Sequence, residues 1–182
     1  MKELSMHVYD LMENSTAANS TLVTLTIRDS SRDNIYDFTI EDNGKGMSPE
    51  FLAKVTDPYT TSRTTRKVGL GLPLIKMNTE HCGGGMTLES QLGIGTKLHF
   101  WFQLDHLDRP PMGDLSGTIV MLAAAHEDIH IVYRHITDEG EYTFDTEEIR
   151  EALDGMSMND VSVMKYLKEM VQENLEEIHY HD

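Results

Sequence analysis

The 182-residue sequence predicts an α+β fold: a two-layer α/β sandwich, with helices on one face of a sheet, that carries a small C-terminal α+β extension. Helical and strand patterns alternate over residues 1–106 in the order helix, two strands, two helices, two strands. Two prolines and a glycine then interrupt both patterns between residues 105 and 113. We therefore expect one domain over residues 1–106 and an acidic extension over residues 107–182.

The elements of the first domain follow from apolar spacing and from a helix cap. Leu4, Val8 and Leu11 recur at helical spacing, and Ser48-Pro49 is a favourable helix start. Stretches of alternating apolar and polar residues predict the strands. The predicted elements are helices over 2–18, 48–55 and 72–82 and strands over 21–28, 34–41, 86–90 and 96–104.

The extension shows a second set of periodic segments. A segment of about 70 residues is marginally stable alone, so we expect it to pack on the first domain. Its predicted elements are helices over 114–125, 146–153 and 158–178 and strands over 129–137 and 141–144.

Composition and charge exclude several classes of protein. No apolar run approaches the roughly 18 residues of a membrane span. No secretory signal opens the chain, and one cysteine allows no internal disulfide, so we expect a cytoplasmic protein. The net charge is −16, and residues 110–182 carry 17 acidic against 4 basic side chains. Nucleic acid and anionic membranes are therefore poor partners, and the acidic half is either a solvated surface or a docking surface for a protein partner.

The first predicted helix has a polar face beside its apolar stripe. Glu3, His7, Asp10 and Asn14 share that face by three- and four-residue spacing. Asn14 could give an oxygen ligand to hydrated Mg²⁺, and Asp10 could orient or deprotonate a water. Taken alone, the pattern fits an exposed polar helix face better.

A carboxylate ends the second predicted strand. Asp42 follows the inward parity of Phe38 and Ile40, and a carboxylate at the edge of a core needs a donor. An adenine amino group would be such a donor. Gly44 and Gly46 would then allow a close approach. A tight turn after a strand is the alternative.

Two further motifs contain paired glycines. Arg63, Arg66 and Lys67 precede the helix start at residues 69–72, where free N–H groups and the helix dipole favour an anion, and the three cations would offset triphosphate charge. Thr96 shares the parity of the strand that follows it, so its hydroxyl should face inward near Asp42, unless this segment is an ordinary hairpin turn. No P-loop motif is present in the sequence.

In this order the motifs resemble those of the GHKL superfamily, the ATP-binding fold of histidine kinases, Hsp90-type chaperones, MutL and type II topoisomerases. The resemblance covers about residues 1–104. The corresponding segments are 10–15 (N box), 42–47 (first glycine box), 57–61 (phenylalanine-type box), 68–72 (second glycine box) and 93–96 (glycine-threonine box).

The resemblance implies that ATP and Mg²⁺ lie between the sheet and the helices. Asp42 would bind the adenine amino group, and Asn14 would bind the metal. Asp10 stands where chaperones and MutL carry a water-activating glutamate, one methylene longer. The implied cofactor-binding residues are Asn14, Asp42, Gly44, Gly46, Met47, Gly69, Leu70, Gly71, Leu72 and Thr96.

The short loop between residues 57 and 69 favours the histidine-kinase branch. Residues 1–5, 61–67 and 107–114 more closely resemble stand-alone ATP-binding proteins encoded near iron-only hydrogenase subunits. This implies a kinase that phosphorylates or regulates a separate protein partner, with Arg63, Arg66 or Lys67 stabilising the transferring phosphoryl group. A nucleotide-gated binding module and a slow MutL-like ATPase remain open.

Overall fold

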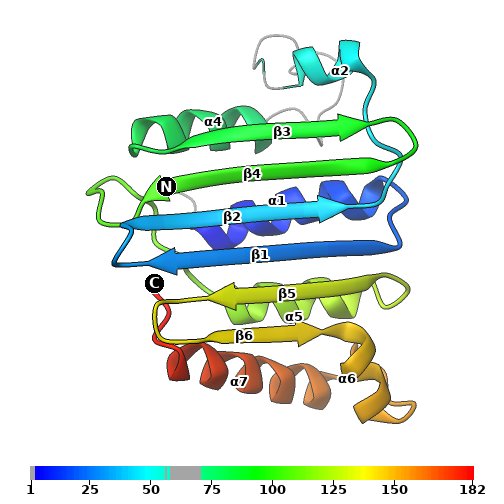
Figure 1. The fold of residues 1–182 in the computed structure, drawn as a ribbon. Helices are drawn as coiled ribbons and strands as arrows, with labels where there is room; N and C mark the ends of the chain where they lie inside the picture. The colour runs from blue at the N-terminus through cyan, green and yellow to red at the C-terminus, as the bar shows by residue number, and fades with distance from the viewer. Residues whose placement is uncertain (1–2, 56, 58–70) are drawn as a thin grey trace.

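The computed structural model describes residues 3–55, 57 and 71–182 (Figure 1). A six-stranded sheet carries helices on one face, which confirms the predicted α+β class. The helices are α1 (Leu4–Ala17), α2 (Pro49–Lys54), α4 (Gly71–His81), α5 (Leu115–Ala125), α6 (Thr146–Leu153) and α7 (Val161–Glu177). The strands are β1 (Leu22–Ser30), β2 (Ile35–Asp42), β3 (Gly85–Gln91), β4 (Gly95–Gln103), β5 (His130–Ile136) and β6 (Glu141–Asp145).

The predicted elements are all found, with ends that shift by a few residues. The last helix shows why an end shifts. It begins at Val161 rather than near residue 158, because the Asp160 carboxylate accepts the amides of Ser162 and Val163 and so caps the helix at that point.

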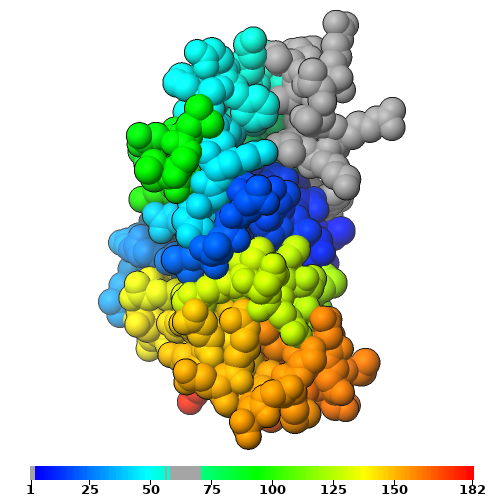
Figure 2. Space-filling view, turned by 90° about the vertical axis from the view of Figure 1, so that its right-hand side faces the viewer, coloured from blue at the N-terminus to red at the C-terminus, as the bar shows by residue number. Residues whose placement is uncertain are grey.

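The extension continues the sheet of the first domain. The strand order is β3-β4-β2-β1-β5-β6, and β5 pairs in parallel with β1 from Leu22 opposite His130 to Arg28 opposite Ile136. The other neighbouring strands pair antiparallel. Figure 2 accordingly shows the yellow and orange residues stacked directly below the blue and cyan ones in one continuous body.

The core lies between the sheet and the helix layer. Strand alternation turns Tyr36, Phe38 and Phe100 inward, and all three are fully buried. Phe38 stacks on Tyr36 and Phe100 with ring centroids 5.1 and 4.8 Å apart, and its edge meets Phe102. This aromatic cluster fixes β2, which ends beside the candidate site, against β4, which begins there.

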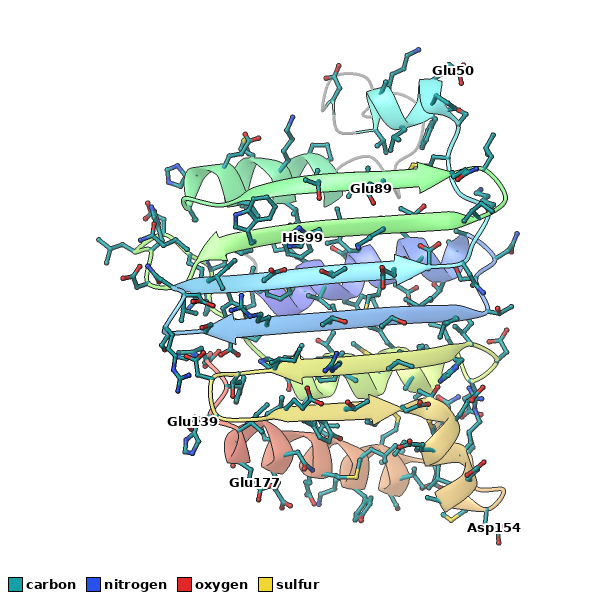
Figure 3. The ribbon with its side chains drawn as sticks, in the orientation of Figure 1. Glu50, Glu89, His99, Glu139, Asp154 and Glu177 are labelled. Atoms are coloured by element: carbon teal, nitrogen blue, oxygen red, sulfur yellow. The ribbon has the colours of Figure 1, made fainter. Side chains whose placement is uncertain are left out.

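The opposite face of the sheet is polar. Glu89 and His99 lie on this face (Figure 3), and His99 Nε2 is 2.7 Å from a carboxylate oxygen of Asp37 on the neighbouring strand. Among the described helices, none has both the length and the apolar character needed to cross a membrane.

Truncating Phe38 tests the importance of the aromatic cluster. Phe38→Ala should lower the free energy of unfolding by about 3–5 kcal/mol, because it leaves a cavity between Tyr36 and Phe100. Thr39→Ala, the next residue on the polar face, should change it by less than about 0.5 kcal/mol. Urea unfolding followed by circular dichroism measures both values. Similar losses in the two variants would contradict this assignment of the core.

Candidate functional site

A cleft with a free volume of about 160 Å³ opens between the helix layer and the ends of the central strands. Most of its walls are apolar, and a few polar side chains lie among them. The apolar walls come from Leu11, Ile40, Met47, Val55, Leu72, Leu88 and Leu98, and the polar side chains are Asn14, Ser15, Asp42, Lys45 and Thr96.

Asp42 lies at the end of β2 and lines this cleft. Its Oδ1 accepts the Gly44 amide at 2.9 Å, so the carboxylate is held by its own turn. The alternative of a tight turn therefore describes the backbone, while the carboxylate still faces the cleft. Asn43 ties the same turn to the start of β1, since its Oδ1 accepts the amides of Thr21 and Leu22 at 2.9 and 3.0 Å.

The glycine-rich loop after β2 is packed against two other elements. The Lys45 amide donates to the Ala18 carbonyl at 2.8 Å, and the Lys45 carbonyl accepts the Gly93 amide at 2.8 Å. Gly46 has φ +71°, and a Cβ there would lie 2.0 Å from the carbonyl oxygen of Gln91. This loop therefore needs glycine at position 46 to join the end of α1 to the β3–β4 hairpin.

Thr96 lies directly opposite Asp42 in the β2–β4 register. Its hydroxyl is 2.8 Å from the Ser90 hydroxyl, which also accepts the Met47 amide at 2.8 Å. Ser90 was not among the residues singled out from the sequence. Its inward parity with Leu88 on β3 is the signal that could have found it.

Helix α1 brings Asn14 to the cleft. Asn14 is partly exposed and lines the cleft. Asp10 is one turn earlier on α1, is exposed, and is not among the described residues that line the cleft. Within the described ranges, no three His, Cys, Asp or Glu side chains gather into a metal cluster.

The opposite wall comes from the start of α4. Leu72 lines the cleft and Gly71 is the first residue of that helix. The first amides of any helix have no acceptor within that helix, so the amides at the start of α4 are potential anion donors. The other predicted phosphate-side residues, namely Arg63, Arg66, Lys67, Gly69 and Leu70, lie outside the described residues.

The arrangement suits a flat apolar ring that carries a hydrogen-bond donor at one edge. The ring would pack between Leu72 and Leu98, and its donor would face Asp42 beside Thr96. A charged group attached to the ring would extend toward Asn14 and the start of α4. These are the demands of a purine nucleotide.

Comparison with known proteins places the chain in a family. The sequence model of the histidine kinase-, DNA gyrase B-, and HSP90-like ATPases matches residues 2–106, so the chain belongs to this family. The predicted GHKL resemblance is thereby confirmed, and the chain contains a histidine-kinase-like ATP-binding domain.

Individual relatives include two curated kinases. The chain is 30% identical over 99 residues to the histidine protein kinase DivJ of Caulobacter vibrioides, which covers 52% of this chain and 17% of DivJ. It is 30% identical over 79 residues to the sensor histidine kinase ZraS of Salmonella typhi, and this match covers 43% of this chain and 17% of ZraS. The chain therefore spans about a sixth of the length of these relatives.

Solved structures share the fold at low sequence identity. The N-terminal domain of a DNA repair protein superposes with a TM-score of 0.56 at 15% identity, covering 80% of this chain and 52% of that one. The Aquifex aeolicus MutL ATPase domain complexed with ADP superposes with a TM-score of 0.50 at 17% identity, covering 82% of this chain and 68% of the MutL chain. Each superposition covers a larger share of this chain than residues 2–106 make up. The likeness in fold therefore reaches into the C-terminal extension.

Two glycines of one hairpin allow a matched test of the packing at Asp42. A Cβ on Gly95 would lie 2.0 Å from the Asp42 carbonyl oxygen, whereas a Cβ on Gly93 would meet nothing within 4 Å, although both residues have positive φ. Gly95→Ala should therefore lower the free energy of unfolding by about 2 kcal/mol or more, and Gly93→Ala by about 1 kcal/mol. Thermal and urea unfolding measure both, and equal losses would show that Gly95 does not constrain this end of β2.

Proposed function

We propose that this protein binds ATP and Mg²⁺ in the cleft and acts as a protein kinase of the histidine-kinase type. Its target would be a separate protein partner that it phosphorylates or regulates. The observation that carries the proposal is the position of Asp42, a carboxylate at the edge of an apolar cleft, opposite Thr96. The family membership and the two kinase relatives support the same nucleotide and the same class of reaction.

In this proposal the base and the phosphates occupy different parts of the cleft. Asp42 accepts the adenine amino group, and the Thr96 hydroxyl lies within reach of the same edge or of an ordered water. Leu72 and Leu98 enclose the ring, whose burial supplies most of the affinity. Gly44, Gly46 and Met47 hold the loop that closes this end.

The phosphate side depends on α1 and α4. An amide oxygen is a suitable ligand for Mg²⁺, and Asn14 is the cleft residue that would hold it together with the phosphates. The metal would neutralise part of the phosphate charge. Gly69, Leu70 and Gly71 would present amides at the start of α4.

Phosphoryl transfer would use the segment between α2 and α4. We propose that Arg63, Arg66 or Lys67 stabilises the charge of the transferring group. Val55 and Leu72, which flank this segment in the sequence, both line the cleft. A slow MutL-like ATPase that uses Asp10 to activate water is the last-ranked alternative, because the loop between residues 57 and 69 is short.

A nucleotide-gated binding module is the second candidate. The observation in its favour is that the acidic extension continues the sheet through the pairing of β5 with β1. A partner bound to the extension would thus bind a segment whose backbone is hydrogen-bonded to the nucleotide domain. In that case ATP would alter partner docking with little turnover.

The division at residue 106 and the closer resemblance to hydrogenase-associated proteins stay predictions.

Neutralising Asp42 tests the nucleotide site. Asp42→Asn should raise the Kd for ATP about 10- to 100-fold, since an amide no longer offers a charged acceptor to the adenine amino group. Glu41→Gln is the matched control, because Glu41 is the adjacent residue of β2 and is exposed 3.6 Å from Lys97. Titration calorimetry measures both constants. An unchanged Kd in Asp42→Asn would refute the assigned pocket.

Transfer of label tests the kinase role. Wild-type protein incubated with γ-labelled ATP, Mg²⁺ and proteins encoded by neighbouring genes should label one of them. Asp42→Asn should abolish this transfer, and Glu41→Gln should preserve it. Tight ATP binding with no labelled protein under any condition would contradict the kinase. Capture of a partner that depends on ATP but occurs without transfer would instead support the gated module.

A further inference from the structure

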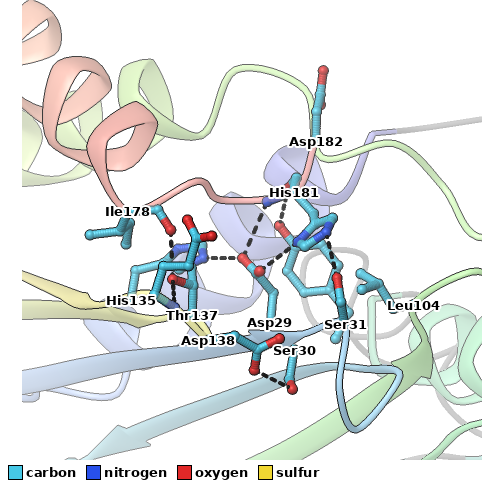
Figure 4. A network of polar contacts seen from close by, with 12 residues as sticks. Asp29, Ser30, Ser31, Leu104, His135, Thr137, Asp138, Ile178, His181 and Asp182 are labelled. Atoms are coloured by element: carbon cyan, nitrogen blue, oxygen red, sulfur yellow. Dashed lines mark hydrogen bonds and ion pairs between the residues drawn. The ribbon is translucent and has the colours of Figure 1, made fainter.

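The segment that follows α7 is bound at the end of the sheet opposite the cleft. This tail segment, residues 178–182, lies across the ends of β1 and β5 (Figure 4). Asp29 there is fully buried, and its carboxylate accepts His181 Nδ1 at 2.7 Å and His135 Nε2 at 2.5 Å. A buried carboxylate requires such donors, so releasing His181 would remove one of two imidazole partners.

A second contact fixes the tail backbone. The Tyr36 hydroxyl donates to the His181 carbonyl at 2.6 Å. Burial, reinforced by the negative charge of Asp29, raises the pKa of Tyr36 well above its ordinary value. The hydroxyl therefore keeps its proton and remains a donor. Thr137 adds a third contact, because its hydroxyl donates to the Ile178 carbonyl at 2.6 Å.

The tail in turn holds the segment that joins the two halves of the chain. Asp182 Oδ1 accepts the Gly113 amide at 3.1 Å, and Arg109 donates to the Asp182 carbonyl at 3.2 Å. The Arg109 guanidinium lies 5.1 Å from the centre of the Tyr36 ring. The two ends of the segment 109–113 are thus bound to Asp182, one through its main-chain oxygen and the other through its side chain.

This joining segment caps α1. The Pro111 carbonyl accepts the Leu4 amide, and the Met112 carbonyl accepts the Ser5 amide, both at 2.9 Å. The N-cap residue Glu3 makes no side-chain capping bond, so these carbonyls take two of the amides that a helix leaves unpaired. Gly113 packs so closely that a Cβ there would lie 2.1 Å from a carboxylate oxygen of Glu3.

We infer that the tail segment is a clamp that positions α1, and through it Asn14, at the nucleotide cleft. A helix transmits a displacement of its first turn along its length, which for the 14 residues of α1 is about 21 Å. His181 and Asp182 are therefore positioning residues for the nucleotide site, although they lie at the opposite end of the sheet. This inference rests on the proposed function of the cleft.

A catalytic reading of the same side chains is less consistent with their surroundings. Ser31 Oγ lies 3.0 Å from His181 Nε2, so serine, histidine and aspartate stand in the order of a hydrolase triad. However, the Arg32 amide, which adjoins Ser31, already donates to Asp138 at 3.1 Å. A carboxylate thus occupies the position where donors to an oxyanion would be needed.

Hydrogen exchange and nucleotide affinity together test the clamp. In His181→Ala and Asp182→Ala, the amides at the start of α1 should exchange about tenfold faster, and the Kd for ATP should rise about three- to tenfold. Asp182→Ala leaves both imidazole partners of Asp29 in place and is the safer variant if His181→Ala fails to fold. His181→Asn should restore wild-type values, because its amide can donate in place of Nδ1.

The control in the same segment is His179→Asn. His179 is 71% exposed and contacts Glu139 at 3.2 Å, and asparagine tolerates its φ of +57°. Faster exchange of α1 with weaker ATP binding, absent in this control, supports the clamp. Faster exchange confined to the tail, or faster exchange of α1 with unchanged affinity, overturns it. A wild-type protein that binds no ATP contradicts the proposed function instead. In that case, hydrogen exchange of the α1 amides without nucleotide still tests whether the tail segment holds the start of α1.

Discussion

The in-register pairing of β2 with β4 is the constraint on which the candidate site depends. It sets Asp42 opposite Thr96 at the strand ends, and the aromatic cluster around Phe38 prevents the two strands from slipping. A shift of one residue would turn the Asp42 carboxylate to the polar face. Gly95 allows the hairpin to approach the Asp42 carbonyl, so the geometry of the carboxylate is fixed by backbone contacts as well as by its own turn.

Helix α1 connects this site to the rest of the molecule. Its middle lines the cleft through Leu11 and Asn14, its end receives the glycine-rich loop at Ala18, and its start is capped from the joining segment. The extension contacts the nucleotide domain through β5 paired with β1, through α5 packed on α1, through the capping of α1 and through the tail bound at Asp29. A partner bound to the acidic extension, as proposed for the gated module, would therefore touch a part of the chain that pairs with β1 and packs on α1.

Local patterns in the sequence predicted much of this architecture. Strand parity identified Asp42 and Thr96 as inward-facing, and the structure places both on the cleft, because the two-residue period of a strand is a local property. The parallel pairing of β5 with β1 was not predicted, since it joins segments about a hundred residues apart and leaves no local signal. The same reason hid the contacts between Asp29 and His181, and Ser90 lies in none of the recognised motifs.

A crystal structure of the protein soaked with a non-hydrolysable ATP analogue and Mg²⁺ tests the central claim most directly. The account predicts the adenine ring between Leu72 and Leu98, with its amino group about 3 Å from the Asp42 carboxylate and the metal beside Asn14. A nucleotide bound elsewhere, or a cleft closed by packed side chains with no room for a base, would contradict it.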